Sequence, residues 1–378
     1  AIGTGDALTV DLAGLAAGAG VPALAGFGPR DDGDEALAVA LAAIGGPVRR
    51  AFTDSVTLPG LAAVWLAPLL RFSPTVDRPA LHYIGTSGVR KSAQLALLQA
   101  FYGLPEPALS WRGTANSIEI ALSALRDALV TVDDLKAGTS DRGAGVKIIQ
   151  AYADRRGRSR ATRTGELAQA RFVGGLLVSA GEDIPSGEAS VAARALFVPV
   201  PADAANLEKL TAAQAAAPNL PTAAARYIAW LLVWRDDLAG VLAERFAAAR
   251  AHYRQVLARR SGINDAGRVA VNCALLDMGA SVGADWLRSA GWTADQANEY
   301  LQATREVLRR LALLQAEAIG EESAALSFLA GLRALLDGRR VELVEVEAGK
   351  SLPALAGCAA STAGGLVIGW RQDDALLL

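Results

Sequence analysis

The pattern of apolar and polar positions is clearest at residues 81–101, where three patterns follow one another. A short apolar run, LHYI, is typical of a buried strand. A glycine-rich turn follows it, and the residues after the turn carry apolar side chains at the spacing of an amphipathic helix. The pattern therefore predicts a strand, a turn and a helix in that order.

Three more apolar runs, at residues 128–134, 172–183 and 195–200, predict further buried strands. Continuous apolar runs of this kind are typical of a parallel sheet that is covered on both faces. We expect the strand at 128–134 to pair beside the first strand, at 81–84. The fold class predicted from these elements is α/β, with a parallel sheet at its centre.

Helical patterns dominate the rest of the chain and suggest four regions. Residues 1–70 read as a helical N-terminal region, and residues 71–205 as the α/β core. Residues 206–320 place apolar side chains at helical spacing and predict a helical lid or bundle. Residues 321–378 read as a helix and two strands, which resembles the end of a winged-helix module, truncated in an apolar run.

Composition narrows the classes of protein. The 378 residues suffice for two or three domains, and two cysteines with two histidines exclude a zinc cluster or a disulfide framework built from those residues alone. Alanine makes up much of the 52% hydrophobic content, and the most apolar run, at 58–70, is too short to span a bilayer. We expect a cytoplasmic segment of a longer protein, with no membrane partner. The formal net charge of −2 means that any nucleic-acid surface must be local.

The turn after the first strand carries most of a phosphate-binding loop. Its sequence, GTSGVRKS, differs from the pattern G-x-x-x-x-G-K-[ST] only at Arg90, which replaces a glycine. Backbone N–H groups of such a turn and the helix N-terminus would surround phosphates, Lys91 would reach the β- and γ-phosphates, and Ser92 would hold Mg²⁺. We expect Arg90 to keep a negative φ and to point away from the nucleotide. The alternative is an ordinary turn between a strand and a helix. The predicted nucleotide-binding residues are Gly85, Thr86, Ser87, Gly88, Val89, Arg90, Lys91 and Ser92.

Two carboxylates end the strand at residues 128–134, about 40 residues after Lys91. In ATPases with a phosphate loop, the first acid of such a pair anchors Mg²⁺ and the second polarises the attacking water. These roles would fall to Asp133 and Asp134. The alternative is an aspartate pair that only caps a strand end.

An arginine-rich segment follows at residues 141–171. It carries eight arginines and lysines against three acidic residues, a local charge of +5. Glycines interrupt it, which predicts a loop or hairpin suited to contacts with a phosphate backbone. The alternative is an ordinary solvated loop. The residues that we expect to contact DNA are Arg155, Arg156, Arg158 and Arg160.

Several other side chains have a structural explanation. Residues 116–119, NSIE, read as a capping box in which Asn116 caps a helix and Glu119 reaches back to it. Trp111 precedes this helix, and a half-buried position suits it better than stacking on a base. The tryptophans of the helical region are expected to be packing anchors; they are Trp230, Trp234, Trp286 and Trp292.

Five segments stand in the order found in ATPases with a phosphate loop: GTSGVRKS, WRGTANSIE, LVTVDD, LLVSAGEDIPSGEAS and ARALFVPV. The set resembles the AAA+ domain, related to superfamily 3 helicases, of replication proteins from phages and mobile elements. DUF927-type ATPases and a group of actinobacterial mobile-element proteins are similar in spacing. In these proteins a primase-polymerase domain often precedes the ATPase domain. The ATPase domain would occupy residues 71–205 of this chain.

The resemblance implies roles for single residues. Ser179 would be the sensor that orients the hydrolytic water, with Glu182 as second candidate, and Arg194 would be the finger that reaches the γ-phosphate of a neighbouring subunit. Sites shared between subunits imply a homo-oligomeric ring, most simply a hexamer. The arginine-rich segment would form a hairpin in the central channel and hold single-stranded DNA.

These residues favour an ATP-driven helicase that requires ATP and Mg²⁺ and moves on single-stranded DNA. A second hypothesis is an assembly scaffold that binds nucleotide and hydrolyses it slowly or not at all, since Arg90 and the aspartate at position 134 depart from the usual motifs. A third is a phosphotransferase on the same fold, although no second compact substrate motif is visible in the sequence.

Overall fold

The computed structural model describes residues 33–103, 109–136, 141–153, 160–161, 167–168, 173–182, 194–258, 266–337, 341–345, 366–372 and 375–377. By internal contacts the chain divides into two compact units after Ile319. The boundaries that we expected near residues 70 and 205 do not separate compact units, because helices on both sides of each boundary share one hydrophobic core.

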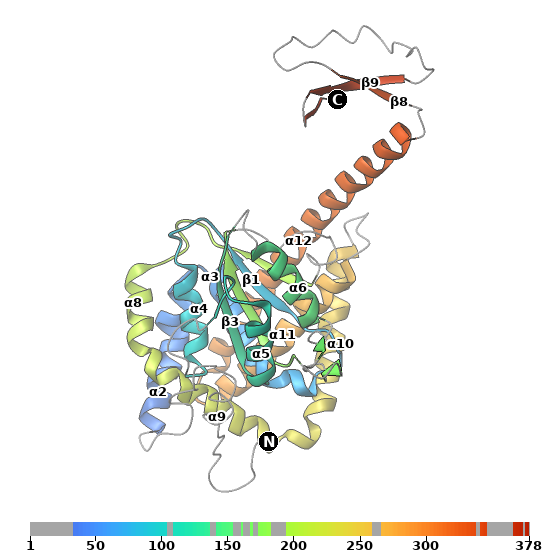
Figure 1. Cartoon of the computed structure of the whole chain (residues 1–378). Helices are drawn as coiled ribbons and strands as arrows, with labels where there is room; N and C mark the ends of the chain where they lie inside the picture. Colours follow the sequence, from blue (N-terminus) through green and yellow to red (C-terminus); the bar gives the residue numbers. More distant parts are fainter. Residues whose placement is uncertain are drawn as a thin grey trace. The chain divides into compact units, whose positions relative to one another are not determined.

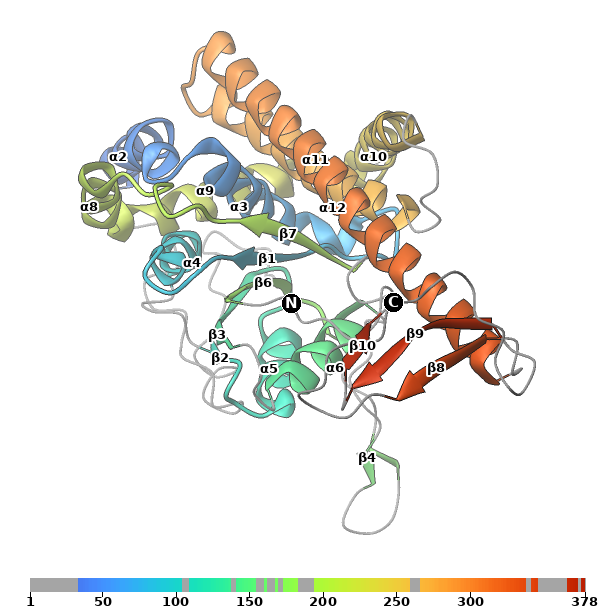
Figure 2. The ribbon, with the colours of Figure 1, turned by 90° about the horizontal axis from the view of Figure 1, so that it is seen from above.

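A five-stranded parallel sheet forms the centre of the first unit (Figure 1). Strand β3 does not pair with β1 as we expected, because β6 lies between them: Leu129 pairs with Leu176, and Leu81 pairs with Val178. The predicted parallel α/β sheet is confirmed, and Figure 2 shows the order from β7 to β2. In spatial order the strands are β2 (Leu109–Ser110), β3 (Leu129–Leu135), β6 (Leu176–Gly181), β1 (Ala80–Ile84) and β7 (Ala195–Pro199).

Helix α3 (Asp54–Leu66) lies in the core, and its residues 56–66 are all buried. The ring of Trp65 packs against Phe101, Tyr227 and Trp286 at centroid distances of 5.2–5.6 Å. The segment Asp54–Phe72 is long and apolar enough to cross a membrane, but 83% of its window is buried inside the protein. Such burial is what the core helix of a globular unit shows.

The other helices lie around the sheet and α3. Helix α6 covers residues for which we predicted a loop or hairpin, so the first part of the arginine-rich segment is helical. The helices predicted from residue 206 onward are present, and their role as a lid stays a prediction. The bounds are α2 (Gly33–Ala43), α4 (Lys91–Ala100), α5 (Ala115–Ala124), α6 (Asp141–Ala153), α8 (Leu207–Ala216), α9 (Leu220–Val233), α10 (Arg235–Ala258), α11 (Ala266–Ser289) and α12 (Ala294–Asp337).

The second unit begins within α12 and contains a three-stranded sheet. Its strands are β8 (Val341–Glu345), β9 (Leu366–Gln372) and β10 (Ala375–Leu377). The expected helix and two strands are therefore present. Strand β8 pairs parallel to β9, and β10 pairs antiparallel to it. The winged-helix module stays a prediction.

Three local predictions were wrong. Helix α5 is capped by Thr114, whose hydroxyl accepts a hydrogen bond from the Ser117 N–H at 3.2 Å, so Asn116 is not the cap. Trp111 is fully buried rather than half-buried. Trp234 is 52% exposed and is not a packing anchor, whereas Trp286 is buried as expected.

Candidate functional site

The carboxyl ends of the parallel strands bring the predicted phosphate loop and the two aspartates together. The loop follows β1, the aspartates end β3, and Glu182 follows β6. Because all three strands are parallel, these ends meet at one edge of the sheet. They line a cavity of about 420 Å³. The lining residues are Ser87, Gly88, Arg90, Lys91, Ser92, Asp133, Asp134, Leu135, Gly181 and Glu182.

Two glycines are required by the backbone of the loop. A Cβ on Gly85 would lie 2.7 Å from the Val200 carbonyl oxygen, so no larger residue fits without a shift. Gly88 has a φ of +87°, a conformation that residues with side chains rarely adopt. The sequence therefore folds into this loop because glycine stands at these two positions.

Arg90 contradicts what we expected of it. Its φ is 66° and its ψ is 30°, the left-handed conformation, at the position directly before α4. Its side chain is exposed and lines the cavity instead of pointing away from it. A left-handed conformation costs a residue other than glycine about 1–2 kcal/mol. The loop thus keeps the backbone that a glycine would give and stores strain at a site residue.

Lys91 is buried, and its Nζ atom donates hydrogen bonds to the carbonyl oxygens of Gly85 at 2.7 Å and Thr86 at 2.9 Å. Burial lowers the pKa of Lys91, while the negative charges of Glu182 and the two aspartates oppose this shift. The lysine is therefore placed among three carboxylates at the loop, where it can bind a phosphate group that approaches the N-terminus of α4.

The two aspartates occupy an irregular end of β3. The pairing register with β6 shifts between Val132 and Leu135, and Asp134 has a φ of 68°. The N–H of Asp134 donates to the carboxylate of Asp133 at 2.7 Å. This bend aims both side chains at the cavity instead of at opposite faces of the sheet.

Arg112 forms an ion pair with Asp134, a contact that the sequence did not predict. Its Nη2 atom lies 2.8 Å from the Asp134 carboxylate, and Lys136 lies 3.8 Å from the same carboxylate. Arg112 follows β2, in which Ser110 pairs with Asp133. Strand β2 is only two residues long, which is too short for a hydrophobic pattern to predict it. Only the pairing of β2 with β3 shows that Arg112 reaches the site.

Ser179 does not line the cavity. It pairs with His82 inside the sheet, and its hydroxyl lies 2.8 Å from the His82 Nδ1 atom and 3.3 Å from the Leu81 carbonyl oxygen. It is 1% exposed and precedes the end of β6 by two residues. Glu182, the second candidate, lies at the cavity in its place.

Arg194 lies directly before β7, at the amino edge of the sheet. The phosphate loop lies at the carboxyl edge, so Arg194 faces away from the loop of its own chain. It lines a small pocket together with Arg78, Arg268 and Asp77.

Three of the four predicted DNA-binding arginines, Arg155, Arg156 and Arg158, lie outside the described residues. Arg160 begins β4 (Arg160–Ala161), which pairs antiparallel to β5 (Leu167–Ala168). A hairpin pairing is thus present in the stretch between the aspartates and β6.

The predicted magnesium ligands, Ser92 and Asp133, both line the cavity. Within the described ranges, no group of three or more His, Cys, Asp or Glu side chains could hold a metal ion. Mg²⁺ in nucleotide sites is held by one or two protein oxygens together with phosphates and water. The hydroxyl and the carboxylate at this edge fit that kind of binding.

Comparisons with known proteins found a family model and a solved structure that match this chain. The domain of unknown function DUF927 matches residues 49–171, which include the loop and both aspartates. A search of curated proteins gave no match. A solved structure described as "SCCmec type IV Cch - active helicase" matches with a TM-score of 0.58 and 16% sequence identity. The match covers 91% of this chain and 59% of that chain, so the chain has a similar fold and spans little more than half of that helicase's length.

Proposed function

We propose that this chain is the ATPase part of a helicase of a mobile element, which binds ATP with Mg²⁺ at residues 85–92 and hydrolyses it. The observation that carries the proposal is the convergence of Lys91, Ser92 and the Asp133–Asp134 pair at one edge of a parallel sheet. The likeness of the fold to a helicase of SCCmec supports the choice of function among the many that a phosphate loop serves.

Each residue has a distinct role in this proposal. The backbone N–H groups of the loop and of the first turn of α4 bind the phosphates, and Lys91 binds the β- and γ-phosphate oxygens. Ser92 and Asp133 hold Mg²⁺, which when bound neutralises charge on the phosphate oxygens. Asp134 orients the attacking water. Glu182 lies at the position where we expected a sensor and takes that role from Ser179.

The ring is a further part of the proposal. Arg194 stands at the edge opposite the loop of its own chain, so its action on a γ-phosphate requires a neighbouring copy. A homo-oligomeric ring, such as a hexamer, meets this requirement. Mixing Lys91→Ala chains with Arg194→Ala chains tests it: a mixed ring regains ATP turnover, because some interfaces contain both intact residues. Turnover that stays absent in the mixture contradicts a shared site.

Contact with single-stranded DNA is assigned to Arg155, Arg156, Arg158 and Arg160. Replacing all four should weaken DNA binding and reduce the slope of log affinity against log salt by up to about 3, since each phosphate contact to a single strand contributes about 0.7. ATP binding should not change. An unchanged DNA affinity removes this segment from the DNA-binding surface.

A nucleotide-binding scaffold is the second candidate function. The strained backbone of Arg90 and the ion pair between Arg112 and Asp134 favour it, because both alter groups that hydrolysis needs. Equilibrium binding of ATP together with single-turnover hydrolysis separates the two functions. Tight binding without turnover in an assembled ring supports the scaffold, and turnover supports the helicase.

A further inference from the structure

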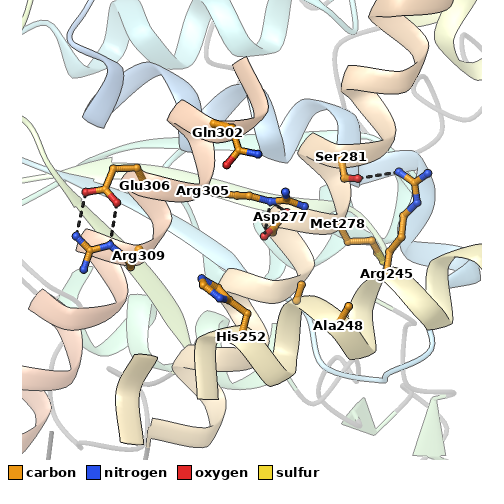
Figure 3. Close-up of a pocket in the computed structure, with 11 residues that line it drawn as sticks. Arg245, Ala248, His252, Asp277, Met278, Ser281, Gln302, Arg305, Glu306 and Arg309 are labelled. Carbon is orange, nitrogen blue, oxygen red and sulfur yellow. Dashed lines mark hydrogen bonds and ion pairs between the residues drawn. The ribbon is translucent and has the colours of Figure 1, made fainter. Parts of the chain in front are cut away.

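A second cavity, of about 530 Å³, lies among the helices α10, α11 and α12 and shares no residue with the cavity at the phosphate loop. Figure 3 shows its walls. On each helix the lining residues follow the spacing of one face. They are Arg245, Ala248, Ala249 and His252 on α10, Asp277, Met278 and Ser281 on α11, and Gln302, Arg305, Glu306 and Arg309 on α12.

A buried carboxylate fixes one of the guanidinium groups of this cavity. Asp277 is 3% exposed, and its two oxygens accept from the Nε atom of Arg305 at 3.0 and 3.2 Å. The hydroxyl of Tyr253 lies 3.4 Å from the same carboxylate. A buried charge needs a partner, so Asp277 orients the arginine. The Nη atoms of Arg305 make no hydrogen bond with any residue that the structure describes, and they remain able to donate.

Two exposed polar side chains face the same space. Gln302 extends from α12 and His252 from α10 (Figure 3). In the described part of the chain, neither the amide of Gln302 nor the imidazole of His252 makes a hydrogen bond. Together with Arg305 they place donors of three different kinds around one cavity.

The residues that line the cavity carry more positive than negative charge. Glu306 accepts hydrogen bonds from Arg309 and Arg310, which lower its pKa to about 2, so it is charged at neutral pH. Arg245 is paired with Asp285, 2.6 Å away. Among the lining residues, three arginines stand against two carboxylates, which leaves a net charge of +1. The arginines are Arg245, Arg305 and Arg309, and the carboxylates are Asp277 and Glu306.

We propose that this cavity binds a small phosphate monoester. A guanidinium fork binds the oxygens of a phosphate in pairs, and three donor side chains match the three terminal oxygens of a monoester. The volume lies within the range of small-molecule sites, about 300–1,000 Å³. Met278 and Ala248 offer apolar surface to the organic part of the ligand.

Isothermal titration with phenyl phosphate tests the proposal. The full chain carries Lys91→Ala so that the phosphate loop does not contribute. We expect saturable binding of one molecule. Arg305→Lys keeps a charge beside Asp277 but removes the fork, and it should weaken binding about 10-fold or more. Gln302→Ala and His252→Gln should each weaken it about 2- to 10-fold.

Matched controls lie on α10 outside the cavity, where Arg254 and Gln255 are exposed. Arg254→Lys and Gln255→Ala should leave the affinity unchanged. Because Gln302 is exposed and makes no hydrogen bond with a described residue, Gln302→Ala should keep the wild-type melting temperature. The His252 ring lies edge-on to the Tyr253 ring at a centroid distance of 5.2 Å, so His252→Gln should lower the melting temperature only slightly. Absence of saturable binding, or an equal affinity in all variants, overturns the site. Benzoate that binds as tightly as phenyl phosphate overturns the choice of phosphate.

Discussion

Arg90 offers a quantitative test of how the loop is built. Its φ of 66° is in the left-handed region, which glycine adopts without strain and other residues rarely adopt. The Arg90 side chain makes no hydrogen bond or ion pair with a described residue. Arg90→Gly should remove a strain of about 1–2 kcal/mol. The greater conformational freedom of glycine in the unfolded chain lowers the free energy of unfolding by about 0.5–1 kcal/mol. We expect a net increase in the free energy of unfolding between about 0 and 1.5 kcal/mol.

Urea unfolding of the wild type and of two variants measures this effect, with an unchanged m-value as the check that the transition is the same. Arg90→Ala is the matched control, because it removes the same side chain and keeps the left-handed strain. We expect Arg90→Ala to stay close to the wild type and Arg90→Gly to exceed both. Without strain, Arg90→Gly would be about 0.5–1 kcal/mol less stable than Arg90→Ala, and that result would contradict the strain that we assign to this backbone.

Four further predictions concern the same site. Gly85→Ala should destabilise the fold by about 1–3 kcal/mol in urea unfolding, because its Cβ would meet a backbone oxygen at 2.7 Å. Arg112→Gln should change the free energy of unfolding by less than about 1 kcal/mol, because exposed ion pairs contribute little. The same variant should raise kcat for ATP, because it releases the Asp134 carboxylate. An unchanged kcat would show that the ion pair does not restrain this carboxylate. ATP affinity should fall as pH rises through the lowered pKa of Lys91, since only the charged amine binds phosphate, and Lys91→Arg should remove this fall in a fluorescence titration. Ser179→Ala should leave kcat near the wild-type value, because this hydroxyl is buried away from the cavity; a large loss of kcat would restore it as the sensor.

Local pattern was enough to predict the elements that carry the loop. The strand β1, the turn and α4 follow one another over about 20 residues, and the glycine spacing with a lysine at the helix start predicted a phosphate loop there. The apolar run that becomes β3 was equally clear, as was the aspartate pair at its end. These elements could be predicted because each one is specified by residues that are close together in the sequence.

What the sequence did not predict depends on pairing between distant segments. The insertion of β6 between β1 and β3 has no local signature, and it places Ser179 inside the sheet. The approach of Arg112 to Asp134 depends on the short strand β2. The left-handed backbone of Arg90 follows from the loop geometry as a whole, since an arginine by itself favours a negative φ.

The cavity between α10, α11 and α12 was invisible for the same reason. Asp277 and Arg305 are 28 residues apart and lie on different helices. In the sequence each belongs to an ordinary amphipathic pattern. Only the packing of the two helices buries the carboxylate and aims the arginine into the cavity.

We propose ATP hydrolysis at the loop of residues 85–92 by a motor that acts on single-stranded DNA. Steady-state ATP hydrolysis, measured with and without single-stranded DNA for the wild type and for Lys91→Ala, tests this proposal. We expect turnover that DNA stimulates and that Lys91→Ala abolishes. Turnover that survives in Lys91→Ala, or none under conditions where the wild-type ring assembles, would contradict it.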